Sequence, residues 1–234
     1  KFLKRAGCKL ISLDKDLEKL TKEYVNNTKR PLLVLILGTS ILKQDHFDQI
    51  KNFLKDKQFD SLDLLLQIVA GDGTIAFEVL NMIRSKVTGK LLCIAPGLLS
   101  GPGTLIALGS DLVLGVKDSF IMPLDIAHAH PAIHFWFLGK DEIHPAFEEN
   151  KEEYERSYPK NIEYAKKVLH DVDSERLIKY LTFQPDAKLS DFEFPKLIET
   201  GLKGHIPSGD DLIRLRAMQG IVQGALADFI YLIQ

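Results

Sequence analysis

Four mostly apolar segments, each followed by a turn and a helical pattern, constrain the fold of this chain most strongly. The segments are Leu32–Leu37, Leu62–Val69, Leu91–Ile94 and Leu112–Val116. Runs of this kind are typical of strands that are covered on both faces, as in a parallel sheet. Helical patterns follow the first three at residues 45–57, 74–86 and 104–109. Strands alternating with helices predict an α/β fold with a largely parallel sheet.

Helical patterns also occupy both ends of the chain. An amphipathic helix is expected over residues 14–28, and charged helices are expected over 142–167 and 174–182. The last apolar stripe runs from Leu212 to Ile230. It predicts one amphipathic helix whose stripe continues into a subunit contact.

The composition is that of an ordinary globular chain. With 234 residues, 45% of them hydrophobic, the chain can bury a sizeable core. Its formal net charge of −2 gives no basic excess for nucleic acid. We expect a single domain over residues 1–234, with a core at about 30–125 and a helical, oligomerising region at about 126–234.

The cysteines and the hydropathy of the chain indicate in which cellular compartment the protein is expected. The two cysteines, Cys8 and Cys93, cannot form a disulfide framework, and Cys93 lies in an apolar run where we expect it to be buried. No stretch reaches the ~20 apolar residues of a membrane span. Because the chain starts at Lys1 and not at methionine, we expect either a cytoplasmic protein or one held at the cytoplasmic side of a membrane through a preceding segment.

Two glycine turns each follow a predicted strand and precede a predicted helix. They are Gly71-Asp72-Gly73 and Gly101-Pro102-Gly103, in consecutive β-α units. Such turns direct backbone N–H groups at whatever lies above them, and two turns can converge on one carbonyl oxygen as an oxyanion hole. The alternative is that both are tight turns that allow close packing of helix on sheet. Their spacing leaves both interpretations open.

The sequence around these turns resembles a known family. The strongest match is Gly-Thr-Leu-Ile-Ala-Leu-Gly-Ser-Asp at 103–111, continued by Ser-Phe-Ile-Met-Pro-Leu-Asp at 119–125. Weaker matches lie at Arg30-Pro31, at 64–80 and at Glu199-Thr200-Gly201-Leu202. These motifs resemble the serine dehydrogenase proteinase family of the Clp/crotonase superfamily, which is related to signal peptide peptidase A and the Clp peptidases.

The resemblance implies a fold and a chemistry. The fold is a Clp/crotonase-like spiral of β-β-α units with additional C-terminal helices. In active relatives a serine attacks the peptide carbonyl, while amides of the first glycine turn and of the residue after the serine hold the oxyanion. Here Gly101 occupies the serine position, and Pro102, which has no N–H, follows it. A histidine of some relatives corresponds to Ser190, and the loop that contains Asp125 is only partly conserved relative to the family pattern.

We therefore predict a serine dehydrogenase proteinase-like protein with degenerate or absent peptidase activity. Its groove would still bind an extended peptide or an unfolded protein segment by strand-edge pairing. The candidate groove residues are Gly71, Asp72, Gly73, Pro102, Gly103, Asp125, His128 and Ser190. We also expect a homo-oligomer, with no cofactor, no metal and no nucleic acid.

Two other functions stay open. Ser100 lies one residue before the family's nucleophile position, and in the first alternative it serves an active serine-type peptide hydrolase. A hydroxyl shifted by one residue points in a different direction from that of the nucleophile, so a turn or capping role is favoured for Ser100. In the second alternative, a crotonase-like acyl-CoA enzyme uses an oxyanion hole with Asp72 or Asp125 as acid or base. The sequence has no evident adenine- or phosphate-binding cluster for that activity.

A histidine-rich segment offers a further candidate site. His128, His130 and His134 are followed by His144. His130 and His134 are spaced to share a helix face and bind zinc, and one of these histidines is a candidate general base near Ser100. Pro131 interrupts that spacing and aromatic residues follow it. We therefore favour an aromatic and histidine-rich surface or a packed interface, and predict no metal site.

Overall fold

A six-stranded sheet forms the centre of the computed structural model, which describes residues 2–38, 40–124, 151–169, 173–182, 189–225 and 228–234. The strand order is β7-β5-β3-β2-β1-β8. The strands are β1 (Leu32–Ile36), β2 (Phe59–Gln67), β3 (Val87–Ile94), β5 (Leu112–Leu114), β7 (Gly204–His205) and β8 (Phe229–Ile233). All neighbours pair in parallel except β1 and β8. The predicted α/β class with a largely parallel sheet is confirmed.

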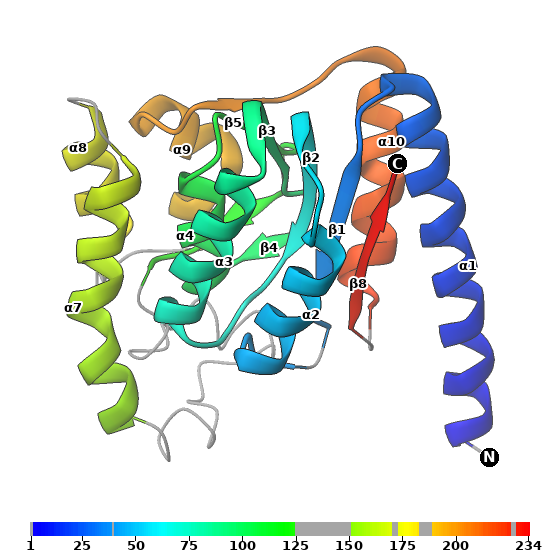
Figure 1. The fold of residues 1–234 in the computed structure, drawn as a ribbon, viewed down its shortest axis with the longest axis horizontal. Helices are drawn as coiled ribbons and strands as arrows, with labels where there is room; N and C mark the ends of the chain where they lie inside the picture. The colour runs from blue at the N-terminus through cyan, green and yellow to red at the C-terminus, as the bar shows by residue number, and fades with distance from the viewer. Residues whose placement is uncertain (1, 39, 125–150, 170–172, 183–188, 226–227) are drawn as a thin grey trace.

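Helices cover both faces of this sheet (Figure 1). One face carries α2 (Gln44–Leu54), α3 (Gly73–Ser85), α4 (Pro102–Leu108), α7 (Lys151–Val168), α8 (Asp173–Tyr180) and α9 (Phe194–Thr200). The other face carries α1 (Phe2–Thr28) and α10 (Gly209–Gln223). Successive side chains of a strand point to opposite faces, so Leu33 joins the first apolar cluster and Val34 the second. Coverage on both sides explains why the strands read as unbroken apolar runs.

A second sheet consists of two short parallel strands, β4 (Leu98–Leu99) and β6 (Phe120–Ile121). β4 follows β3 in the chain, and β6 follows β5. β4 lies inside the segment 95–104, which the sequence predicts only as a turn. Ser100, directly after β4, donates its N–H to the carbonyl of Ile68, 3.0 Å away, so the small sheet is tied to the end of β2.

The single C-terminal helix predicted between Leu212 and Ile230 is wrong. α10 ends at Gln223, where Gly224 caps it, and residues 229–233 form β8, antiparallel to β1. Apolar residues beyond Gly224 continue the helical spacing, but the unpaired edge of β1 offers them backbone hydrogen bonds instead. The second half of the chain is therefore not only helical, since it adds β7 and β8 to the central sheet.

The other predicted elements are found with shifted ends. α1 starts at Phe2, well before the predicted residue 14. α7 is described from Lys151, and residues 142–150 of the predicted helix lie outside the described part of the chain. Cys93 is buried, as expected. Among the helices of the described residues, none combines the length and the apolar character that crossing a bilayer requires.

Candidate functional site at the two glycine turns

The first glycine turn joins β2 to α3. Asp72 is the N-cap of α3, and its carboxylate accepts a hydrogen bond from the N–H of Thr74 at 2.6 Å. Aspartate favours this position because its side-chain oxygen satisfies an N–H group that the helix leaves unpaired. The Asp72 side chain is exposed. It therefore has a structural role in the cap, and its oxygen is already used there.

The backbone of this turn pairs with the loop after β1. Leu42 donates its N–H to Ala70 O at 2.9 Å and accepts from the N–H of Asp72 at 3.0 Å. Gly71, between them, has φ 137°, and a Cβ at this position would overlap the Leu42 backbone. Its own N–H and C=O take no part in the pairing, and neither has a hydrogen-bond partner within the described part of the chain. Gly71 thus leaves one donor and one acceptor at a short strand edge.

The second glycine turn joins β4 to α4. Gly101 is the N-cap of α4 with φ 47° and ψ −108°. Such a backbone at a sharp turn from strand to helix is the strained geometry in which hydrolases present a nucleophile. Gly101 has no side chain to present. The position predicted from the family pattern therefore has the elbow backbone but lacks the reactive group.

The start of α4 lies against the end of β2, three residues before the first glycine turn. A Cβ on Gly103 would overlap the carbonyl oxygen of Ile68, which shows how closely the start of α4 approaches the end of β2. Thr104 fixes the same end of α4 from the other side, because its hydroxyl donates to Met122 O at 2.8 Å. Close helix–sheet packing, the alternative that the sequence leaves open, is thus one role of these glycines.

Ser100 does not present its hydroxyl to solvent. The residue is 0% exposed, and its Oγ has no hydrogen-bond partner in the described residues. A serine nucleophile needs an exposed hydroxyl next to a base. The structure brings no described basic side chain into hydrogen-bond contact with this oxygen.

The start of α4 offers few backbone donors to an oxyanion. The N–H of Gly101 donates to Pro123 O at 3.0 Å, and that of Gly103 donates to Ser100 O at 2.9 Å. Pro102, between them, has no N–H. The amide of residue 102, which the sequence resemblance predicts as an oxyanion donor in active family members, is therefore absent. Unlike the amides of Gly101 and Gly103, the N–H of Gly71 has no partner among the described residues.

Asn161 is the residue of this site that the sequence did not predict. It comes from α7, is 7% exposed, and donates its Nδ2–H to Leu124 O at 3.1 Å. Its Oδ1 fills the space that a Cβ on Gly73 would take, and this oxygen has no hydrogen-bond partner among the described residues. An amide side chain does not titrate near neutral pH, so Asn161 cannot act as the general base of a hydrolase.

α7 is held over the first turn by aromatic packing as well. Phe77 of α3 stacks on Tyr164 of α7 with ring centroids 4.4 Å apart and an interplanar angle of 9°. Lys167 lies over both rings. The sequence analysis predicts α7 only as part of a charged helix, and that pattern gives no sign of these contacts. Gly73 is the feature of the sequence from which a contact at this place could have been predicted. A glycine in the first turn of a helix suggests that another group approaches the backbone closely.

The remaining predicted site residues lie elsewhere. Ser190 is exposed in the short 3-10 helix η1 (Leu189–Phe192), which packs against α9. Asp125, His128 and the other histidines of that segment lie outside the described residues. Within the described ranges, no three His, Cys, Asp or Glu side chains are grouped so that they could hold a metal ion.

Comparison with known proteins gives distant structural similarity. No protein-family model matches the chain, and no curated protein sequence matches it. A crystal structure of a peptidase from Plasmodium falciparum aligns over 76% of this chain and 95% of its own, with 14% identity and a TM-score of 0.42. A structure described as that of an enzyme aligns over 76% and 96%, with 14% identity and a TM-score of 0.45. At this similarity, the function has to be argued from the residues themselves.

Proposed function

We propose that this chain is a serine dehydrogenase proteinase-like protein of the Clp/crotonase type that has lost peptide hydrolysis and binds extended peptide segments at its first glycine turn, since Gly101, Pro102 and Gly103 of the second turn are buried. The observation that carries the proposal is Gly101, a residue without a side chain in the backbone geometry of a nucleophile elbow. The buried hydroxyl of Ser100 and the missing N–H of Pro102 support the loss of chemistry. A peptidase needs both groups, the nucleophile to attack and the donor to stabilise the oxyanion.

The strand order supports the Clp/crotonase part of the proposal. Two successive strands of the main sheet, β3 and β5, are each followed by a strand of the small sheet. The chain thus alternates between two sheets, as expected for a spiral of β-β-α units.

The edge at Gly71 supports peptide binding. Its N–H and C=O are the complementary pair that an added strand would use. Ile41, the residue before Leu42, is a large apolar side chain that is 53% exposed. We propose Ile41 as the apolar contact of a bound peptide, because it is exposed and precedes the Leu42 backbone that pairs with this turn.

Covalent labelling tests the loss of hydrolysis. A serine-reactive fluorophosphonate is expected to leave the folded protein unlabelled, and fluorogenic peptides are expected to remain uncleaved. Labelling that disappears in the Ser100→Ala variant would contradict the proposal and establish the hydrolase alternative. Calorimetry with a coenzyme A ester tests the acyl-CoA alternative, and heat that depends on Asp72 would establish it.

Peptide binding is tested separately by fluorescence polarisation. A labelled, extended apolar peptide is expected to bind, and its analogue N-methylated at alternate residues is expected to lose binding, because methylation removes the N–H donors of a strand. Ile41→Asp should weaken binding. Ile213→Asp is the matched control, because Ile213 is 66% exposed on α10, on the opposite face of the sheet. Equal effects of the two substitutions would refute a groove at Gly71.

A further inference from the structure

β8 forms one edge of the central sheet, and no strand of the described residues lies beyond it (Figure 1). The bonds of β1 show which backbone groups of β8 are used. Leu37, directly after β1, donates its N–H to Gln67 O, so this residue and alternate residues before it face β2. Val34 has the opposite orientation and faces β8, where it lies opposite Tyr231. The N–H and C=O of Tyr231 are therefore used within the sheet.

Ile230 and Leu232, on either side of Tyr231, direct their N–H and C=O groups away from β1. No group of the described residues is hydrogen-bonded to them there. The residues of β8 other than Ile230 stay partly exposed, so the described part of the chain does not cover this edge. An added strand would find both donors and acceptors along it.

The two edges of the sheet are built differently. β7, at the other edge, has two residues, and a short strand is one way in which proteins protect an open edge. β8 has five residues, none of them charged, glycine or proline, and it pairs with β1 without a bulge. It thus lacks the devices that prevent edge-to-edge pairing. A natural edge of this kind is expected to be paired in the native assembly.

The two ends of β8 carry charges of opposite sign. Asp228 precedes the strand, and its Oδ1 accepts from the N–H of Gly38 at 3.1 Å while its Oδ2 lies 3.7 Å from His46 Nε2. Lys57 lies at the other end, because its Nζ donates to the side-chain oxygen of Gln234 at 2.7 Å. Antiparallel pairing of two such strands brings unlike ends together, whereas parallel pairing brings like charges together. The edge is therefore complementary to a second copy of itself.

We propose that β8 pairs edge to edge and antiparallel with β8 of a second copy of this chain, with the two Tyr231 residues opposite each other. In this register Ile230 of each copy exchanges backbone hydrogen bonds with Leu232 of the other. The relation between the copies is two-fold, so the pairing closes and uses the β8 edge of both.

The same register brings the charged ends together. It places Asp228 opposite Gln234 of the second copy, and hence near Lys57 of that copy. Asp228 can accept this contact in addition to its present ones, because a carboxylate has about four acceptor sites. The two-fold axis repeats the contact at the other end of the strand pair.

Sedimentation equilibrium of the full chain measures the association. The contact is one strand pair, smaller than the ~1,200 Å² of a standard interface, so we expect a monomer–dimer equilibrium with a Kd on the order of 10–100 μM. Leu232→Pro removes an outward N–H and no bond to β1, and should raise the Kd by about tenfold or more. Leu232→Ala loses the same side chain but keeps the N–H, so it should associate more tightly than Leu232→Pro. Circular dichroism checks the fold of both.

Amide hydrogen exchange with residue resolution locates the contact. Well below the Kd, the N–H groups of Ile230 and Leu232 should exchange fast, and well above it they should be protected. Tyr231 is the internal control, because its N–H is bonded to β1 and should exchange slowly at both concentrations.

Charge reversal tests the register. Lys57→Glu places two acidic groups opposite each other in the dimer and should weaken association by about threefold or more. Lys55→Glu makes the same change at an exposed lysine after α2 and should leave association unchanged. Equal association of the two variants would overturn the register centred on Tyr231.

Three other results would overturn the pairing itself. The first is a folded chain that stays monomeric at concentrations far above the expected Kd. The second is a folded Leu232→Pro variant that associates as the wild type does. The third is slow exchange of Ile230 and Leu232 in the monomer, which would mean that another part of the chain covers the edge. None of these results bears on the glycine turns, so failure here is separable from failure of the peptide groove.

Discussion

Tyr24 in α1 donates its phenolic hydrogen to the buried carboxylate of Asp63 in β2 across 2.6 Å. Arg30 lies 2.8 Å from the same oxygen, Oδ2, whereas Oδ1 is buried without a hydrogen-bond partner in the described residues. Burial raises the pKa of Asp63 above its ordinary value, and this effect outweighs the lowering by Tyr24 and Arg30. The long N-terminal helix is thus attached to the sheet through an ionisable group.

Removing this hydrogen bond should destabilise the protein in a pH-dependent way. Because the pKa of Asp63 is raised on folding, the folded chain binds more protons than the unfolded chain between the two pKa values, and stability falls as the pH rises through that window. Tyr24→Phe removes a donor to the ionised form and should cost about 1.5–3 kcal/mol at pH 7. Near pH 3.5, where Asp63 is largely neutral, the loss should be smaller.

Urea unfolding of wild type and variant at both pH values measures this difference. Tyr231→Phe is the matched control, because Tyr231 shares a hydrogen bond of 3.3 Å with the neutral hydroxyl of Thr21. Its effect should be small and the same at both pH values. A pH-independent loss in Tyr24→Phe would show that Asp63 is not the group involved.

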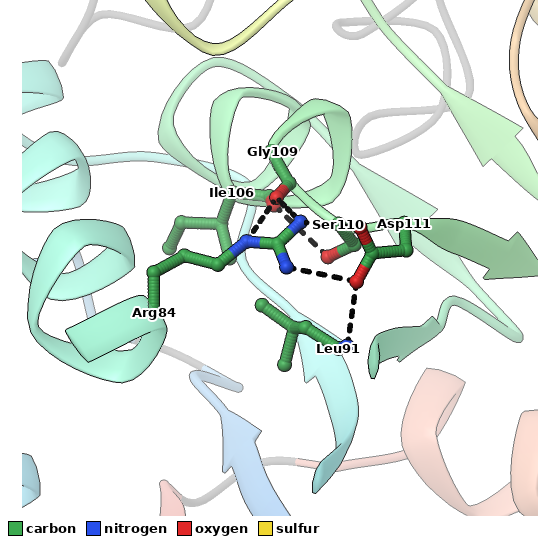
Figure 2. Close-up of polar contacts among 6 residues, drawn as sticks. All are labelled: Arg84, Leu91, Ile106, Gly109, Ser110 and Asp111. Carbon is green, nitrogen blue, oxygen red and sulfur yellow. Dashed lines mark hydrogen bonds and ion pairs between the residues drawn. The ribbon is translucent and has the colours of Figure 1, made fainter. Parts of the chain in front are cut away.

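Arg84 Nη1 and Asp111 Oδ2 form an ion pair at 2.8 Å (Figure 2). This pair should stabilise the fold at neutral pH and lose that effect in acid. Although burial raises the pKa of Asp111, hydrogen bonds from Arg84 and from the N–H of Leu91 lower it below the ordinary value. A lowered pKa gives stability that is present above the unfolded value and is lost as the pH falls through the folded value. Asp111 is 42% exposed, so solvent screening limits the cost of Asp111→Asn to about 0.5–1 kcal/mol.

The measurement is chemical denaturation at pH 7 and at several lower pH values. Because the pKa of Asp111 is lowered on folding, the stability difference between the variant and the wild type should shrink as the pH falls below the ordinary carboxyl range. Asp211→Asn breaks an exposed pair with Arg214 on α10 and should have almost no effect at pH 7. If the two variants lose the same stability at pH 7, the Arg84–Asp111 pair contributes no more to stability than an exposed surface pair does.

Any side chain at Gly101 should lower the stability of the folded protein. Its φ of 47° and ψ of −108° lie where L-residues are strained, so Gly101→Ala should lose about 1–3 kcal/mol of stability. Gly220→Ala is the opposite case, because Gly220 lies inside α10 with open space around the Cβ position. It should gain about 0.5–1 kcal/mol through helix propensity. Urea unfolding compares them, and equal effects would contradict a strained elbow.

The sequence predicts the sheet well and its edges poorly. Leu32–Leu37 is buried on both faces. A strand of this kind is a continuous apolar run in the sequence, so it can be predicted from local sequence alone. β8 leaves no such pattern, because residues 229–233 also satisfy helical spacing and their strand state depends on pairing with β1, about two hundred residues earlier. Gly224 is the local sign that α10 ends.

In the candidate site, too, some features could be predicted from local sequence and others could not. The two glycine turns could be predicted because strand, glycine and helix are neighbours in the chain. The buried state of Ser100 depends on its backbone hydrogen bond to Ile68, a residue that is distant in the sequence, and no local pattern reveals that contact. Asn161 reaches the site only through the packing of α7 on α3.

Because α7 packs on α3 in this way, substitutions at Gly73 and Asn161 should have non-additive effects on stability. Gly73→Ala should cost about 1–3 kcal/mol, because its Cβ would overlap the amide of Asn161. Asn161→Ala should cost about 1–3 kcal/mol, because the buried carbonyl of Leu124 loses its donor. The double variant should be more stable than the sum of the two by about 1–2 kcal/mol, since removing the amide makes room for the added methyl.

Urea unfolding of the four proteins gives this coupling energy. The control background is Asn52→Ala, which removes an exposed asparagine on α2. Gly73→Ala should cost as much in that background as in the wild type. Additivity of Gly73→Ala and Asn161→Ala within about 0.5 kcal/mol would mean that α7 does not lie on the first glycine turn in solution. Coupling of the expected sign would instead place Asn161 at the turn, so that any peptide bound at Gly71 lies next to a residue of α7.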